Sequence, residues 1–332
     1  MKKIIAIVLS LVMILSLTAC GAKEAAPAEE PAGAATELKV AIIQQLDHSS
    51  LDEIREAIKA QLNALAEPTN YTITIEEYNG QNDTSMLTQI ATQVVADDPD
   101  MIIPIATLAA QYAVLAAEGT DIPIVYAAIS DPESAGLVGL PNVTGVSDAL
   151  NTPFILDMML AAQPDVQTVG LLYSTSEINS EAPIAEAKEY LDAKGIAYIE
   201  KTGTTTGEIT EAAASLVGRV EAVFTPTDNA VMAAEASVAE LLNAGGIAHY
   251  TGADSFVQSG AFTTCGVNYT ELGTKSADIA FDILMGGEIG EFVIMDGGII
   301  TVNTDTAAAI GVDYEVFNTM ANTVNAVTTV VD

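Results

Sequence analysis

The chain has 332 residues and carries 45 acidic residues against 11 basic ones, a formal net charge of −34. So acidic a chain offers no basic patch that could neutralise phosphates, which excludes a nucleic-acid partner and direct adhesion to anionic lipid. Its length suits two domains with cores of their own.

A positively charged start precedes a short apolar segment. Lys2 and Lys3 are followed by residues 4–17, which only Ser10 and Ser16 interrupt. This run is shorter than the roughly 20 apolar residues of a spanning helix and has the length of a signal-peptide core. The letters LTAC at 17–20 resemble the lipobox of bacterial lipoproteins. We therefore predict a lipoprotein signal peptide over 1–19 and a lipid anchor on Cys20, on the extracytoplasmic face of the bacterial plasma membrane.

The stretch after Cys20 is rich in Ala, Pro, Glu and Gly and has no apolar periodicity. Such a composition cannot bury enough surface to offset chain entropy, so we expect a disordered tether over 20–36. The other cysteine, Cys265, then has no partner for a disulfide or a redox pair. We expect it to be a small buried residue.

The body alternates strand-like and helix-like segments. In its first half, strands are predicted at 38–44, 71–78, 101–106, 123–129 and 142–146. Helices are predicted over 51–65 and 86–95 and from Thr107. The pattern then restarts with strands at 168–173, 197–201, 222–225, 247–251 and 261–265. Helices over 181–195, 208–217 and 229–243 lie between them.

A further helix over 270–288 and strands at 292–295 and 299–302 follow the second half. Alternating strands and helices predict parallel sheets, so we expect an α/β fold of two doubly wound parallel-sheet lobes joined by a hinge. The added elements indicate that the chain crosses back. The expected N-lobe is 37–149 plus about 261–290, and the expected C-lobe is 150–260 plus about 291–332.

Hydroxyls and carboxylates recur where the apolar runs stop. They are Thr107, Ser130, Asp131, Ser147, Asp148, Ser174, Thr175, Glu177, Asn179, Ser180, Thr227, Asp228, Asn229, Asp254 and Ser255. Helix capping uses the same residue types and explains any one position equally well. Six such strand ends on two sheets favour a lined ligand cleft.

Both ends of an amino acid can be matched in such a cleft. An ammonium suits a buried carboxylate, and we expect Asp254 in this role, with Asp228 or Glu177 as rivals. A carboxylate suits the helix start at Thr107–Ala109, helped by Ser130 and Ser180. Tyr126, Tyr173 and Phe224 lie near strand ends and could stack on an aromatic ligand, although core packing explains each of them alone.

Several motifs resemble the substrate-binding family of ABC transporters that includes tryptophan and tyrosine binders. They are DHSSLDEIREAIKAQL, PDMIIPIATLAAQ, IPIVYAAISDPESAGLV, NVTGVSD, EAVFTPTDNAV and VNYTELGTKSADIAFDILMGG, and they span nearly the whole body. The resemblance implies a type I periplasmic-binding fold and delivery of ligand to a permease and its ATPase. Three family motifs are altered here, at 47–52, at Leu108, and at 173–180, where proline and glycine are lost.

Strand ends and resemblance together define an expected ligand-binding set. It comprises Gln45, His48, Thr107, Ala109, Ser130, Asp131, Ser174, Glu177, Asn179, Ser180, Thr227, Asp228, Asn229 and Asp254. We expect no cofactor and no metal site, because two histidines and one free thiol make no cluster with ligand spacing. The expected function is an importer component that captures tryptophan, tyrosine or phenylalanine.

An enzyme is the less favoured class. No GxSxG elbow accompanies His48 or His249, and no nucleotide-binding glycine motif occurs. His249 lies in an apolar strand, which indicates a structural role. Two other binding roles stay open: a sensor lipoprotein that signals to a membrane receptor, and an importer component for a non-aromatic amino acid, a nucleoside or a sugar.

Overall fold

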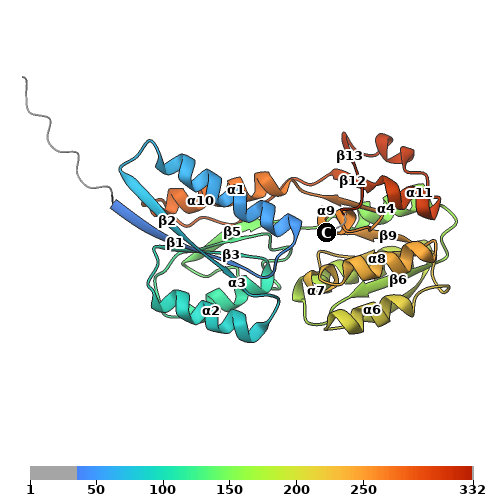
Figure 1. Ribbon diagram of the computed structural model, residues 1–332, viewed down its shortest axis with the longest axis horizontal. Helices are drawn as coiled ribbons and strands as arrows, with labels where there is room; N and C mark the ends of the chain where they lie inside the picture. Colours follow the sequence, from blue (N-terminus) through green and yellow to red (C-terminus); the bar gives the residue numbers. More distant parts are fainter. Residues whose placement is uncertain (1–35, 331–332) are drawn as a thin grey trace, which may run out of the picture. The chain divides into compact units, whose positions relative to one another are not determined.

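The computed structural model describes residues 36–330, which fold into two α/β lobes (Figure 1). The expected signal peptide and Cys20 lie outside the described residues, as does the expected tether up to residue 35. Thr36, assigned to the tether, instead begins the first strand, where its N–H bonds Asn70 O at 2.9 Å. No helix within 36–330 is both long and apolar enough to cross a membrane.

The N-lobe is a six-stranded sheet with the order β11-β5-β4-β3-β1-β2, in which every pairing is parallel. Its strands are β1 (Thr36–Gln44), β2 (Tyr71–Asn79), β3 (Met101–Ile105), β4 (Ile124–Ala127), β5 (Val143–Ser147) and β11 (Val293–Ile294). Its helices are α1 (Ser49–Ala66), α2 (Thr84–Ala96), α3 (Thr107–Ala116) and α10 (Tyr269–Leu284). Helices α1 and α10 pack together on one face, and α2 and α3 on the other (Figure 1).

The C-lobe is a seven-stranded sheet with the order β13-β12-β10-β9-β8-β6-β7. Its strands are β6 (Thr168–Tyr173), β7 (Ala197–Thr202), β8 (Ala222–Thr225), β9 (Ala248–Thr251), β10 (Thr263–Gly266), β12 (Ile299–Asn303) and β13 (Thr323–Val327). All pairings are parallel except β10 with β12.

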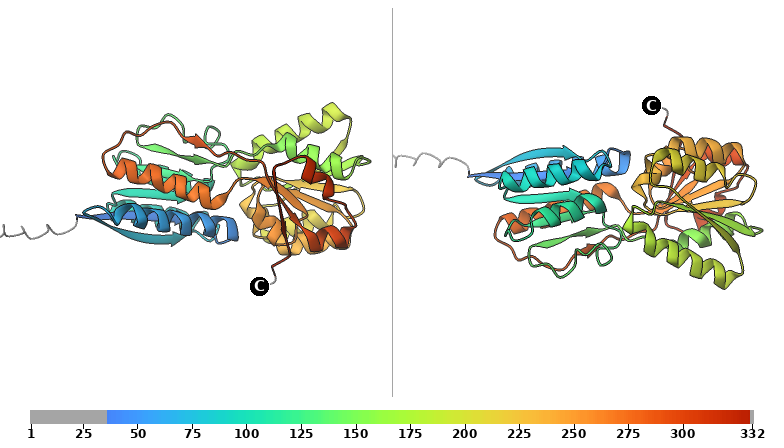
Figure 2. Two further views of the ribbon diagram at one scale, coloured as in Figure 1. Left: turned by 90° about the horizontal axis from the view of Figure 1, so that it is seen from above. Right: turned by 90° about the horizontal axis from the view of Figure 1, so that it is seen from below.

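The C-lobe helices cover both faces of that sheet (Figure 2). They are α4 (Thr152–Ala162), α5 (Glu181–Lys194), α6 (Thr206–Ala214), α7 (Asn229–Met232), α8 (Glu235–Ala244), α9 (Asp254–Gln258) and α11 (Thr304–Ile310), with short 3₁₀ turns η1 (Ile178–Ser180) and η2 (Glu315–Thr319). Helices α4 and α5 pack together, as do α6 and α8. The apolar sides of these helices and the strands between them form the core of the lobe.

The chain crosses between the lobes three times: after β5, after β10 and between β11 and β12. The expected boundaries need correcting at two of these points. Strand β10 was assigned to the N-lobe but pairs with β9 and β12 in the C-lobe. Strand β11 was assigned to the C-lobe but extends the N-lobe sheet beside β5. Apolar pattern alone does not say which sheet edge a short strand will join.

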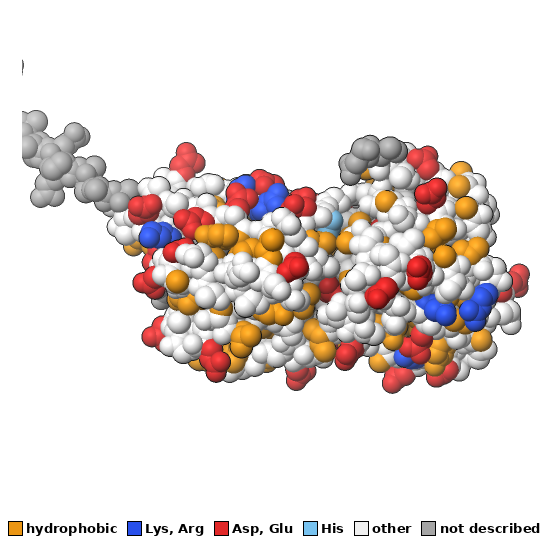
Figure 3. Space-filling model, turned by 60° about the horizontal axis from the view of Figure 1, so that its bottom comes forward, with side chains coloured by type: hydrophobic (Ala, Val, Ile, Leu, Met, Phe, Trp, Pro, Cys, Tyr) orange, Lys and Arg blue, Asp and Glu red, His pale blue; other side chains and the backbone are white. Residues whose placement is uncertain are grey.

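On the face of the molecule shown in Figure 3, the acidic side chains are not gathered in one patch. Figure 3 shows Asp and Glu scattered across the visible face, with few Lys or Arg side chains among them. The largest ionic cluster joins Arg55 and Lys59 of α1 to neighbouring carboxylates, including Glu77 of β2. The high charge therefore solvates this face and marks no site there.

Candidate functional site

A cavity lies between the two lobes, beyond the carboxyl ends of the parallel strands. Its lining residues are His48, Ser50, Leu51, Ala106, Thr107, Ala128, Ser130, Asp148, Asn179, Thr227, Asp228, Asn229, Met232, Ala253, Ser255, Phe256 and Tyr269. Its volume is about 30 Å³. Small-molecule pockets usually enclose about 300–1,000 Å³, so the lobes must part or side chains must move for such a ligand to fit.

Direct hydrogen bonds hold the lobes against each other around this cavity. Gln45 Nε2 donates to Glu177 Oε1 at 2.8 Å. The hydroxyls of Ser130 and Thr227 lie 2.7 Å apart, and Ser50 Oγ donates to Asp254 Oδ1 at 2.8 Å. His48 Nε2 lies 3.4 Å from Asn229 Oδ1. The cavity wall is therefore polar on both lobes, and these groups would be released when the lobes open.

The N-lobe side of the cavity is built on unusual backbone. Ala106, after β3, has φ 72° and ψ 164°, and Ala128, after β4, has φ 58°. Residues with a Cβ avoid these regions at a cost of order 1–3 kcal/mol, and such strain gathers at functional sites. The turn at Ala106 starts α3 inside the cavity wall. The N–H of Leu108 is already taken by Gln45 Oε1 at 3.0 Å.

Four carboxyl groups lie around the cavity, and their bonding separates their roles: Asp148, Glu177 and Asp228 are buried, and Asp254 is half-buried. Asp228 accepts from the N–H of Ser174 at 2.6 Å, from Ser180 Oγ at 2.7 Å and from the N–H of Val231 at 2.9 Å. Three donors from its own lobe make it a fixed structural cap of α7. Asp254 starts α9, accepts from Ser50 and lies outside the cavity lining.

Asp148 and Asp228 are the two carboxylates of the cavity lining, and Asp148 is the one with few hydrogen-bond donors. It follows β5, and its Oδ1 accepts from Ser130 Oγ at 3.0 Å. Burial raises its pKa to about 6, against the lowering effect of the Ser130 bond. Because its charge is desolvated and only weakly compensated, this carboxylate has most to gain from a cation in the cavity.

Three polar atoms of the cavity lining are buried without a hydrogen-bond partner among residues 36–330. They are His48 Nδ1, Asn179 Oδ1 and Ser255 Oγ. Burial also lowers the pKa of His48 to about 4, so the imidazole is neutral near pH 7. Unpaired buried polar atoms each cost about 1–3 kcal/mol, and three of them around one cavity indicate a wall shaped for a polar ligand.

The structure brings half of the expected ligand-binding set into the cavity wall. Those residues are His48, Thr107, Ser130, Asn179, Thr227, Asp228 and Asn229. Gln45, Glu177, Ser174 and Ser180 lie behind the wall, in the bonds described above. Ala109 is buried in the N-lobe core, and Asp131 caps a turn by accepting from Ser134.

The aromatic residues of the wall were not identified from the sequence. Phe256 of α9 and Tyr269 of α10 line the cavity, together with Leu51 and Met232. Tyr126 and Phe224 are instead buried in the cores of their lobes, and Tyr173 donates to Glu200 at 2.9 Å. Tyr269 is the first residue of α10 and Phe256 the third residue of α9. Neither is a polar residue at a strand end, so the strand-end signal could not mark them.

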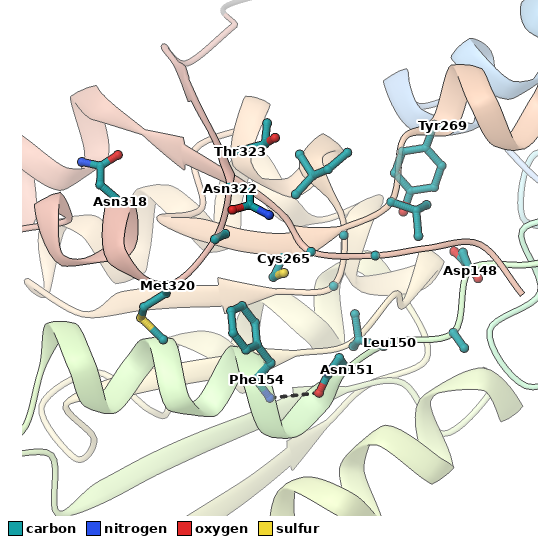
Figure 4. Close-up of a pocket in the computed structure, with 18 of the residues that line it drawn as sticks. Asp148, Leu150, Asn151, Phe154, Cys265, Tyr269, Asn318, Met320, Asn322 and Thr323 are labelled. Atoms are coloured by element: carbon teal, nitrogen blue, oxygen red, sulfur yellow. Dashed lines mark hydrogen bonds between the residues drawn. The ribbon is translucent and has the colours of Figure 1, made fainter.

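A second, larger hollow of about 700 Å³ lies beside the crossing segments (Figure 4). Phe154 of α4 and Met320 lie near each other towards one end, Cys265 of β10 lies close to Phe154, and Asp148 and Tyr269 stand towards the other end. The Cys265 side chain is buried, as expected, and burial raises its pKa to about 11. Asp148 and Tyr269 thus border both this hollow and the cavity between the lobes.

The second histidine belongs to a closed network in the C-lobe core. His249 Nδ1 lies 3.0 Å from Glu235 Oε1, and His249 Nε2 lies 2.8 Å from Thr225 Oγ1. All three side chains are fully buried. The spacing is that of a hydroxyl–imidazole–carboxylate relay, but a substrate could not reach the hydroxyl. Among residues 36–330, no group of three His, Cys, Asp or Glu side chains could hold a metal ion.

Two doubly wound lobes, three crossing segments and a polar cavity between strand ends define a two-lobed binding protein. The match to a family model, over residues 39–322, makes the class specific: the chain belongs to the family of ABC transporter substrate binding proteins. A tyrosine-binding protein of Clostridioides difficile is 30% identical over 320 residues, which cover 93% of this chain and 92% of that protein.

Two solved structures that match this chain differ in whether a ligand is bound. An ABC domain in complex with L-Trp from Streptococcus pneumoniae matches with a TM-score of 0.81 and 28% identity, over 87% of this chain and all of that one. A ligand-free, open substrate-binding protein from Clostridium difficile matches with a TM-score of only 0.66 at 30% identity, over 88% of this chain and all of that one. At similar identity, the TM-score is thus higher to the L-Trp complex than to the ligand-free, open structure. The direct hydrogen bonds between the lobes described above agree with a closed arrangement here.

Proposed function

We propose that the protein captures an aromatic amino acid, tryptophan, tyrosine or phenylalanine, between its lobes and delivers it to an ABC permease and its ATPase. The observation that carries this proposal is the cavity wall, which combines a weakly compensated carboxylate, unpaired polar atoms and aromatic side chains. The L-Trp complex and the tyrosine-binding relative support it, since each binds a ligand of this class.

The charged ends of the ligand have complementary partners on the wall. The ammonium is assigned to Asp148 in place of Asp254, because Asp254 is bonded by Ser50 and is not itself part of the lining. The carboxylate is assigned to the start of α3 at Thr107, with the hydroxyls of Ser130 and Thr227 beside it. The lining contains no Lys or Arg, so backbone N–H groups and hydroxyls must carry the anion.

The ligand ring is assigned to the apolar part of the wall. Phe256 and Tyr269 provide ring faces or edges, and Leu51 and Met232 provide adaptable apolar contact. His48 is neutral near pH 7 and offers a nitrogen without a partner, which suits an indole N–H or a phenol hydroxyl. The cavity must widen for any of these rings, and we assign that widening to opening of the hinge.

A thermal-shift panel tests the ligand class. The panel contains the twenty amino acids, several sugars and several nucleosides. At a hundred times its dissociation constant, a ligand should stabilise the fold by about 2.7 kcal/mol, and the aromatic amino acids should give the largest shifts. A shift with a sugar, a nucleoside or a branched-chain amino acid, and none with the aromatics, would contradict the proposed ligand.

Membrane attachment through a lipid on Cys20 completes the proposal. It rests on the apolar segment and the LTAC letters before Cys20. The protein for the panel should therefore be extracted from the membrane fraction of its host, where intact mass shows whether Cys20 carries acyl chains. If Cys20 is unmodified in that material, the proposed lipid anchor is wrong, but the proposed binding function is not affected.

A further inference from the structure

A continuous chain of four polar side chains ties the lobes together, beginning in the cavity wall and ending behind it. It runs from His48 to Asn229, from Asn229 to Glu177 and from Glu177 to Gln45. His48 and Gln45 belong to the N-lobe, and Asn229 and Glu177 to the C-lobe. The chain therefore crosses between the lobes twice, and the carboxyl group of Glu177 is part of its middle. We call these four residues the latch.

The direction of each bond in the latch is fixed by its neighbours. The N–H of Leu108 can only donate, so Gln45 Oε1 accepts from it at 3.0 Å. Gln45 Nε2 must then donate, and it does so to Glu177 Oε1 at 2.8 Å and to Asn82 Oδ1 at 2.9 Å. Asn229 Nδ2 donates to Glu177 Oε2 at 3.2 Å. Both oxygens of Glu177 are thus held by neutral amides, one from each lobe.

No cation balances Glu177. It is 1% exposed, and among residues 36–330 no Lys, Arg or His lies within ion-pair distance of it. The neighbouring carboxyl is Asp228, whose own pKa burial raises against the lowering effect of three donors of its own lobe. These donors favour the ionised form of Asp228, whereas Glu177 has only neutral amide donors, so the added proton is assigned to Glu177. A second ionised carboxylate here would be buried, unpaired and repelled by the first.

We propose that Glu177 takes up one proton from solvent each time the lobes close, so that the latch makes closure proton-dependent. In the closed protein, burial and the charge of Asp228 raise the pKa of Glu177 to about 8. Opening withdraws Gln45 and lets water reach the carboxyl, which then returns towards its ordinary value of about 4.3. Asn179 also lies beside the carboxyl, and its side-chain bond, like those of Asn229 and Gln45, opposes the rise without cancelling it.

The sign of the effect follows from proton binding. Between the two pKa values of Glu177, the closed state holds one more proton than the open state. The equilibrium constant for closure therefore falls as pH rises, by up to tenfold per pH unit. Other groups that face the latch act at lower pH. His48, with a closed-state pKa of about 4, loses a proton on closure below about pH 6.5. Asp148, with a pKa of about 6, gains one below about pH 6.

Two further carboxyl groups, those of Asp228 and Asp254, lie beside the latch. Burial raises the pKa of Asp228, and three donors from its own lobe, which stay with it when the lobes open, lower it. Asp254 is held by Ser50 across the lobes, and burial raises its pKa from an ordinary value near 3.8. The window from about pH 6.5 to about pH 8 therefore reports on Glu177 together with these neighbours, and substitution of Glu177 separates its contribution from theirs. This inference requires only lobe closure and is independent of which ligand the protein binds.

Small-angle scattering of the ligand-free protein from pH 6.5 to 8.5 tests the proposal. The wild-type radius of gyration should rise with pH, because the closed population falls by up to tenfold per unit. Glu177→Gln, which mimics the protonated group, should keep the smaller radius throughout. Gln45→Met, which removes the amide but keeps the length of the side chain, should show the larger radius throughout. A wild-type radius that does not change with pH would overturn the proposal.

Two further measurements separate the latch from general effects of substitution. Glu200→Gln removes a C-lobe carboxyl that bonds only Tyr173 and Lys188, and it should follow the wild-type curve. Infrared difference spectra of wild type against Glu177→Gln should show a protonated-carboxyl band at pH 7 that disappears above pH 8. If the band is absent at pH 7, or if Gln45→Met leaves its titration unshifted, proton uptake is not coupled to the latch.

Discussion

At the scale of single residues, the environment decides what each carboxylate does. Asp228 is saturated by three donors, Glu177 is held by two amides, and Asp254 serves an interlobe bond. Asp148 has one hydroxyl donor and borders the cavity. Because a desolvated carboxylate binds a cation best when nothing else compensates it, Asp148 is the residue on which ligand binding should depend.

Asp148→Asn tests this assignment with little change of shape. Asn can still accept from Ser130, but the charge opposite the ligand ammonium is lost. Calorimetry with L-tryptophan should show binding weakened by about 2–5 kcal/mol, the usual loss when one partner of a buried charge pair is removed. The matched control is Asp157→Asn, at an exposed position bonded to Tyr190, which should change affinity by less than about 0.5 kcal/mol. Equal effects of the two variants would disprove the role of Asp148.

At the scale of elements, the packing of α1 on α10 joins the first and last parts of the N-lobe. Gly273 of α10 makes this approach possible, because a Cβ there would stand 2.5 Å from the carbonyl oxygen of Ile54. Helix α10 begins directly after the second crossing segment and carries Tyr269 into the cavity wall. Close contact between the two helices therefore holds one part of the ligand site in place.

Gly273→Ala should lower the free energy of unfolding, measured by chemical denaturation, by about 1–3 kcal/mol through overpacking against α1. The same change at Gly207 of α6 meets nothing within 4 Å and should raise stability by up to about 1 kcal/mol through helix propensity. If Gly273→Ala is as stabilising as Gly207→Ala, the close approach of α1 and α10 is not a constraint on the fold.

The helices and strands also show which features could be predicted from the sequence and which could not. Short apolar runs between helical patterns predicted the parallel strands, because a strand buried on both faces has apolar residues at nearly every position. Helix α4 was not predicted, since its sequence TPFILDMMLAA is apolar at most positions and lacks the helical period. The cavity-lining Phe256 and Tyr269 could not be selected either, because their direction depends on how α9 and α10 pack. The same packing turns Asp254 towards Ser50 and leaves Asp148 beside the cavity.

At the scale of the whole molecule, the lobes form one closed arrangement whose internal cavity is too small for an amino acid. The bonds between the lobes join polar groups that line or support the proposed ligand site. Opening exposes these groups, and a ligand that satisfies them favours closing again. The family membership, the strained backbone at Ala106 and Ala128 and the unpaired wall atoms all agree with capture by closure.

A crystal structure of the protein grown with L-tryptophan tests this account most directly. We predict the amino acid between the lobes, its ammonium within hydrogen-bond distance of Asp148, its carboxylate at the start of α3, and its ring against Phe256 or Tyr269. The cavity should be wider than the 30 Å³ seen here while the lobes remain closed around the ligand. L-tryptophan bound in the hollow beside Phe154 and Met320, or bound with Asp148 left unengaged, would contradict the central claim.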